Sequence, residues 1–159
     1  MILYHGSNVV VKQPKLVEQN RFLDCGYGFY TTTNEEQVKN FAQKVIVFRG
    51  GKPIVNVYEL DENAFTHLLK IKKFSAPDEK WLNFVSAHRN GTYNGEKYDL
   101  IIGAVANDDV YRTLQVYSAG LLTKEQALEM LKIKKLFNQY VFATQEALQF
   151  LKFIEAREV

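Results

Sequence analysis

The chain has 159 residues, of which 47% are hydrophobic and 24% charged, an ordinary composition for one soluble domain with a buried core. Its 20 basic and 18 acidic residues are largely interleaved, so a net charge of +2 does not indicate nucleic-acid binding. The single cysteine, Cys25, excludes an internal disulfide, and one cysteine with three scattered histidines does not supply a structural zinc site. We expect a single domain over residues 1–159 that holds no metal.

The first half of the chain alternates between short apolar strands and one clear helical pattern. Strands are predicted at Ile2–Tyr4, Phe29–Thr32 and Pro53–Leu60. Between the last two, Asn34 has N-cap character, and Gln37 stands three residues further on, as in a capping box. A helix is therefore predicted to begin at Asn34 and to bury one apolar face.

The second half of the chain mixes helices and strands without regular alternation and without repeats. Its predicted helices are a short one after Asp61, Asp78–Asn90, Asn107–Leu114, Thr123–Lys132 with a Thr123–Gln126 capping box, and 145–151. Its predicted strands are Leu69–Phe74, Tyr98–Gly103, 138–144 and 151–156. This arrangement favours an α+β fold over a doubly wound parallel sheet.

No stretch of the sequence is typical of a secretory signal or a membrane span. The N-terminus lacks a basic start followed by an apolar run and a small-residue cleavage site. No segment is long and apolar enough to cross a bilayer. Together with the lone cysteine, these features predict a cytoplasmic protein that makes no membrane contact.

Two glycine-containing clusters combine residues that suit a cofactor site. Leu3–Ser7 reads Leu-Tyr-His-Gly-Ser, and Gly26–Thr33 reads Gly-Tyr-Gly-Phe-Tyr-Thr-Thr-Thr. Glycine lets backbone amides and carbonyls approach a ligand closely, while histidine and tyrosine supply a hydrogen-bonding group and a flat stacking face. Either cluster alone also suits a structural histidine or an ordinary turn, but the pair indicates a cofactor site.

A third motif near the end of the chain completes a known order. His-Gly-Ser, then Gly-x-Gly-aromatic-Tyr, then Asn-x-Tyr-hydrophobic-aromatic at Asn138–Phe142 resemble the catalytic signature of ADP-ribosyltransferases of the diphtheria-toxin and poly(ADP-ribose) polymerase type. The matching segments span nearly the whole chain. The resemblance implies a split antiparallel β-sheet core with flanking helices and NAD as the substrate. The chain is also similar to small bacterial proteins of unassigned function with this fold, through Tyr98–Gly103 and Val105–Asp109.

The resemblance implies a role for each matching position. His5 would hydrogen-bond a ribose hydroxyl of NAD, and the Gly6 backbone would hold the nicotinamide carboxamide through paired N–H and C=O contacts. Tyr30 would stack on the nicotinamide ring, and Phe41, eleven residues further on, would be the second stacking aromatic. Clamping the ring and ribose would weaken the glycosidic bond and favour an oxocarbenium-like transition state. The other implied NAD-binding residues are Ser7, Gly28, Thr31 and Gln139.

The third motif departs from the polymerase pattern, because Gln139 stands where those enzymes place a glutamate. A glutamate accepts a hydrogen bond from the nicotinamide ribose and places negative charge beside a developing cation, whereas a glutamine keeps only the hydrogen bond. A charge pair at about 4 Å is worth roughly 4 kcal/mol at an effective dielectric of about 20. Polymer synthesis is therefore not expected, while mono-ADP-ribosyl transfer and slow NAD hydrolysis stay open.

Four further charged residues have two interpretations each. In the first interpretation, Asp108 or Asp109 would supply the negative charge that Gln139 lacks. In the second, which the spacing favours, Asn107 or Asp108 would be the N-cap of the helix that begins there. Asp24 is either a turn residue or a contact to the acceptor. Arg89 would pair with the NAD pyrophosphate or, as the position favours, be an exposed arginine at a helix end. His67 and His88 are expected to be packed or surface histidines.

The leading hypothesis is an NAD-dependent mono-ADP-ribosyltransferase with His5, Tyr30 and Gln139 as its catalytic residues. A toxin with a partner antitoxin protein, or a phage-defence toxin, is the biological role that we expect of such an enzyme. The alternative is a non-catalytic NAD- or ADP-ribose-binding module, and chance similarity of an unrelated globular protein is a third reading. The sequence does not identify the ADP-ribose acceptor.

Overall fold

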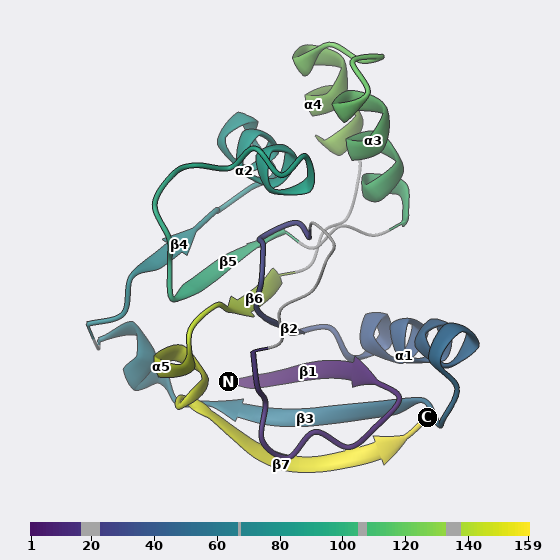
Figure 1. The fold of residues 1–159 in the computed structure, drawn as a ribbon, viewed down its shortest axis with the longest axis vertical. Helices are drawn as coiled ribbons and strands as arrows, with labels where there is room; N and C mark the ends of the chain where they lie inside the picture. The colour runs from purple at the N-terminus through teal and green to yellow at the C-terminus, as the bar shows by residue number, and fades with distance from the viewer. Residues whose placement is uncertain (17–22, 67, 105–107, 133–137) are drawn as a thin grey trace.

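A computed structural model gives the fold of the protein, and the structure describes residues 1–16, 23–66, 68–104, 108–132 and 138–159. Seven strands form one sheet, in the order β4-β5-β6-β2-β1-β3-β7 (Figure 1). They are β1 (Ile2–Ser7), β2 (Phe29–Thr32), β3 (Ile54–Leu60), β4 (Ile71–Lys73), β5 (Leu100–Ala104), β6 (Asn138–Phe142) and β7 (Leu151–Glu158). The fold is α+β, as predicted.

Helices lie among these strands in the described ranges without regular alternation. The α-helices are α1 (Glu35–Arg49), α2 (Glu79–Arg89), α3 (Asp108–Ser118), α4 (Lys124–Lys132) and α5 (Gln145–Leu148), and η1 (Glu62–Phe65) is a 3₁₀ helix. Every helix and strand predicted from the sequence is present, with ends that differ by a few residues. None of these helices combines the length and the hydropathy that a membrane crossing needs.

The neighbouring strands are antiparallel except β4 and β5, which are parallel. β5 begins at Leu100 and not at Tyr98 because Asp99 makes other contacts. Its carboxylate accepts hydrogen bonds from the Lys70 backbone N–H at 2.7 Å and from the Thr144 hydroxyl at 2.9 Å. Asp99 therefore joins the starts of β4 and β5 to the N-cap of α5.

Apolar side chains fill both faces of the sheet. On one face, a cluster that includes Leu3, Phe29, Tyr58 and Phe142 packs with Ala147 and Leu148 of α5. On the other face, one cluster joins Ile101 and Val141 to α2, α3 and α4, and a second joins Val38 of α1 to Val55 and Val57 of β3. Because successive strand residues point to opposite faces, neighbouring positions in β2 belong to different clusters.

The predicted capping boxes form to different degrees. In α4, the Thr123 hydroxyl accepts from the Gln126 N–H at 3.1 Å, and the Gln126 side chain accepts from the Thr123 N–H at 2.9 Å. In α1, Asn34 Oδ1 accepts from the Gln37 N–H at 2.9 Å, but the Asn34 N–H donates to the Thr32 hydroxyl instead. The prediction of a full box at α1 is therefore wrong in its second half, because the end of β2 already supplies the acceptor.

We expect Gly28→Ala to lower the free energy of unfolding by about 1–3 kcal/mol through overpacking. A Cβ at Gly28 would lie 2.6 Å from Val141 Cγ1 and 3.0 Å from the Phe142 carbonyl oxygen. Urea unfolding measures the change, and Gly28→Ala should cost less when it is introduced into a Val141→Ala protein than into the native one. A Gly28→Ala protein as stable as the native one would contradict this packing role.

Candidate functional site

β1 and β2 share a single register pair, Tyr4 with Thr32, although β1 pairs with β3 along its whole length. The Leu60 N–H donates to the Met1 carbonyl oxygen at 2.8 Å, so the odd-numbered residues of β1 exchange hydrogen bonds with β3. The N–H and C=O of Gly6 therefore point toward β2, beyond the last paired residue. We call the point beyond the Tyr4–Thr32 pair, where β1 and β2 no longer pair, the divergence of β1 and β2. Gly6 presents an adjacent donor and acceptor to it.

Gly6 also lies directly under helix α1. A Cβ at this position would be 2.9 Å from the Val38 carbonyl oxygen and 3.1 Å from Cδ1 of Phe41. Only glycine lets the helix approach β1 this closely. The Phe41 ring, which is 52% exposed, consequently lies beside the Gly6 backbone.

His5 is partly buried and is bound to β2 through its ring. Its Nδ1 lies 2.8 Å from the Tyr30 carbonyl oxygen, and its ring packs on Phe29 at 4.2 Å between centroids. Burial lowers the pKa of His5, although the bond to Tyr30 opposes this effect. A carbonyl only accepts, so a neutral His5 carries its proton on Nδ1 and leaves Nε2 as an acceptor.

Tyr30 lies on the opposite face of β2 from Phe29, and both hydrogen-bonding capacities of its hydroxyl are in use. The hydroxyl donates to the Gly26 carbonyl at 2.6 Å and accepts from the Cys25 N–H at 3.1 Å. Burial raises the pKa of Tyr30, so the phenol is neutral. The Tyr30 hydroxyl therefore holds the preceding turn, and its side chain packs against the cluster that covers β5 and β6.

Gln139 lies on the same face of the sheet as Tyr30. It pairs with Thr32 of β2 and with Gly103 of β5, and it is 7% exposed. Its side chain hydrogen-bonds the Cys25 thiol, whose pKa is raised by burial and by the nearby Asp24 charge. Gln139 and Tyr30 are thus joined through one residue, Cys25, that the sequence did not single out.

The predicted residues therefore divide between the two faces of the sheet. Gly6, Tyr30, Phe41 and Gln139 share the face covered by the longer helices, whereas the His5 ring lies with Phe29 on the other face. His5 reaches the shared group only through the Tyr30 carbonyl. A ligand that contacts all of these groups would have to lie across the divergence of β1 and β2.

The remaining NAD-binding candidates have structural partners. The Thr31 hydroxyl is buried and donates to the Tyr140 carbonyl at 2.9 Å, so it joins β2 to β6. Ser7 Oγ accepts from the Val9 N–H at 3.3 Å, and Gly28 packs closely on β6. These contacts account for the three residues without a ligand.

Arg89 is not the exposed helix-end arginine that its position favours. Its Nε lies 2.5 Å from Asp24 Oδ1, and the two side chains are only 16% and 14% exposed. The guanidinium also lies over the Tyr111 ring, with Cζ 4.2 Å from the centroid. Asp24 and Arg89 thus form a mostly buried ion pair that links the turn before β2 to the end of α2.

Of the other charged candidates, Asp109 lies on α3 and others lie outside the described residues. Asp109 is exposed, and its carbonyl accepts from the Thr113 hydroxyl at 3.1 Å within α3. The Asp108 side chain, Asn107 and His67 lie outside the described residues. His88 is packed, as expected, with its ring stacked on Tyr93 at 3.9 Å.

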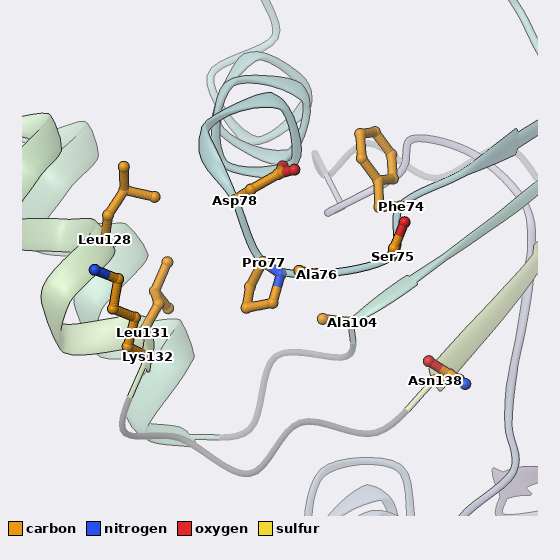
Figure 2. Close-up of a pocket in the computed structure, with 10 residues that line it drawn as sticks. All are labelled: Phe74, Ser75, Ala76, Pro77, Asp78, Ala104, Leu128, Leu131, Lys132 and Asn138. Carbon is orange, nitrogen blue, oxygen red and sulfur yellow. The ribbon is translucent and has the colours of Figure 1, made fainter.

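A cavity of about 510 Å³ lies between α4 and the segment that joins β4 to α2 (Figure 2). Its wall is largely apolar, with Phe74, Pro77, Leu128 and Leu131, and Asn138 borders it next to Gln139. None of the candidate NAD-binding residues lines it. Within the described ranges, no three His, Cys, Asp or Glu side chains gather as a metal site would require.

Residues 1–153 match a protein-family model described as "Protein of unknown function (DUF3990)". The protein belongs to the DUF3990 family. No curated protein and no solved structure matches it. The family match includes every candidate residue of β1, β2, α1 and β6 in this DUF3990 protein. The family description names no activity, so the resemblance to ADP-ribosyltransferases stays a prediction.

We expect the stability of this DUF3990 protein to fall as the pH drops below about 6.5, partly because of His5. Its pKa is lower in the folded state than the ordinary value of 6.5, so the unfolded chain takes up the proton first. The stability that the neutral His5 ring contributes is therefore fully present above pH 6.5 and is lost as the pH falls below that value. Urea unfolding across this range should show a smaller pH dependence for His5→Asn. Identical dependences would contradict the assignment, and His88→Asn gives the separate contribution of the other histidine with a lowered pKa.

Proposed function

We propose that the protein is an NAD-dependent mono-ADP-ribosyltransferase with an ADP-ribosyltransferase-like fold. The observation that carries this proposal is the position of Gly6, whose N–H and C=O face the divergence of β1 and β2 beside an exposed phenylalanine ring. A primary carboxamide needs one acceptor for its NH₂ group and one donor for its carbonyl. Gly6 offers both, and a stacking face for the attached ring lies next to them.

The roles of the other residues follow from where their side chains lie. Tyr30 and Phe41 would contact the nicotinamide through their rings, because the Tyr30 hydroxyl already binds Cys25 and Gly26. Gln139, on the same face, would position the adjacent ribose. His5 lies on the opposite face, so we assign its Nε2 to a hydroxyl of the ribose at the adenosine end of NAD.

The transfer itself breaks the bond between the ribose C1′ and the nicotinamide nitrogen. Nicotinamide leaves with the bonding electron pair, and a nucleophile of the acceptor bonds to C1′ and releases its proton. The chain contributes by holding the ring and ribose in a geometry close to the transition state. Gln139 supplies no negative charge for the oxocarbenium-like centre, which favours single transfer or slow hydrolysis over polymer synthesis.

A second candidate function is binding of NAD or ADP-ribose without catalysis. It is favoured by Gln139, which is buried and already hydrogen-bonded to Cys25, and which lacks the charge of a glutamate. A pocket of this kind would recognise NAD and leave its glycosidic bond intact. The acceptor and the role as a toxin with an antitoxin stay predictions.

We expect native protein to release nicotinamide from NAD and to lose that activity at least about 100-fold in Tyr30→Ala and in His5→Ala. Gln139→Glu should raise the rate at least about tenfold, because a carboxylate would stabilise the developing cation. Chromatographic detection of nicotinamide measures the rates, and labelled NAD traps a modified acceptor in lysate. Full activity in both the His5 and Tyr30 variants would refute the transferase. Native protein that binds NAD without turnover, together with an active Gln139→Glu variant, would favour the binding module.

Phe41 and Phe48 provide a matched test of the stacking role, because both are exposed phenylalanines of α1. Stacking on an aromatic ring is typically worth about 1–3 kcal/mol, so Phe41→Ala should weaken NAD binding roughly tenfold or more. Phe48→Ala, 88% exposed and seven residues away, should bind as native protein does. Calorimetric titration with NAD measures both affinities. Equal affinities would remove Phe41 from the site.

A further inference from the structure

Cys25 holds two residues of the proposed site at once. Its backbone N–H donates to the Tyr30 hydroxyl at 3.1 Å, and its thiol hydrogen-bonds the Gln139 side chain. The next residue, Gly26, accepts from the same Tyr30 hydroxyl at 2.6 Å. A displacement of residues 24–26 would therefore move the Tyr30 ring and the Gln139 amide together.

The position of this turn depends on helix α2. Asp24 pairs with Arg89 at 2.5 Å, and both side chains are largely removed from solvent. Gly26 has a left-handed backbone with φ of +75°, and a Cβ there would lie 3.1 Å from His88 Cδ2. Two consecutive residues at the end of α2 thus contact the turn, one by charge and one by packing.

Helix α2 is itself a fixed support. Trp81, Leu82 and Val85 are at most 1% exposed and belong to the cluster that covers β5 and β6. The other contact of Arg89 is with Tyr111 on α3, so its guanidinium lies between the turn and a second helix. Arg89 is therefore committed to partners within the protein, which argues against its use as a ligand for the NAD pyrophosphate.

We propose that Arg89 is a positioning residue for the transferase site. Through Asp24 it fixes the 24–26 turn, and the turn holds the Tyr30 ring and the Gln139 amide in the orientation that NAD requires. This inference rests on the proposed function for its catalytic consequence. The placement of Cys25 by the ion pair has a readout that does not need turnover.

The test compares Asp24→Asn, Arg89→Gln and the double variant with native protein, with Arg89→Lys as the conservative replacement. Arg112→Gln, an exposed arginine of α3, is the matched control. Thermal unfolding establishes that each variant is folded, and the double variant keeps the test valid if a single unpaired charge prevents folding. Two quantities are measured on each protein: the steady-state constants for nicotinamide release and the rate of Cys25 alkylation by iodoacetamide.

We expect Arg89→Gln to lower kcat roughly 100-fold and to raise the KM for NAD, because both the amide and the stacking ring shift. If the substitution only reduced the fraction of folded enzyme, kcat would fall and the KM for NAD would stay unchanged. The double variant should lose no more than either single variant, since the residues act as one unit, and Arg89→Lys should recover part of the activity. Alkylation of Cys25 should accelerate at least about tenfold when its turn is released.

Unchanged kinetic constants and unchanged alkylation in folded Arg89→Gln would overturn the inference. Independent, additive losses in the two single variants would also overturn it, because the residues would then not act through their ion pair. An inert native protein would refute the proposed function instead. The alkylation rates would still decide in that case whether the ion pair holds Cys25.

Discussion

The candidate site depends on where β1 stops pairing with β2. Both strands are well paired on their outer sides, β1 with β3 and β2 with β6, yet they share one register pair with each other. Backbone groups at a strand edge need a partner, and in most sheets the neighbouring strand supplies it. Here the register between β1 and β2 is limited to Tyr4 and Thr32, so the donor and acceptor of Gly6 lie beyond the last pair. The close contact of α1 with the same glycine places Phe41 at this point.

Local sequence patterns were sufficient to predict the elements that carry the site. The apolar run before His5 and the short run after Gly28 both form strands, and Asn34 caps α1 as its residue type indicates. The α+β class follows from the irregular order of helices and strands. The sequence also placed Tyr30 and Gln139 correctly on strands. It did not show that these two strands are neighbours or that the His5 side chain lies on the other face.

The contacts that long-range packing creates could not be read from the sequence. Arg89 ends a helix, where an exposed cation is the usual outcome, but its partner Asp24 comes from a turn 65 residues away. Cys25 carried no sequence signal because a lone cysteine is most often a small buried side chain. The predicted start of β5 was wrong for the same reason. Asp99 directly precedes an apolar strand in the sequence, but its carboxylate accepts hydrogen bonds from Lys70 and Thr144, which are distant in sequence.

The strand order has a consequence for how the protein folds. β1 and β2 come from the first residues of the chain, whereas β6, which pairs with β2, comes from near its end, and the contact between Thr31 and Tyr140 spans 109 residues. Contacts of such high sequence separation pay a large loop-closure entropy and form slowly. A chain emerging from the ribosome would expose β1, β2, β3 and α2 well before β6 becomes available. Any activity built on Tyr30 and Gln139 would thus arise only after β6 has been synthesised and has paired with β2.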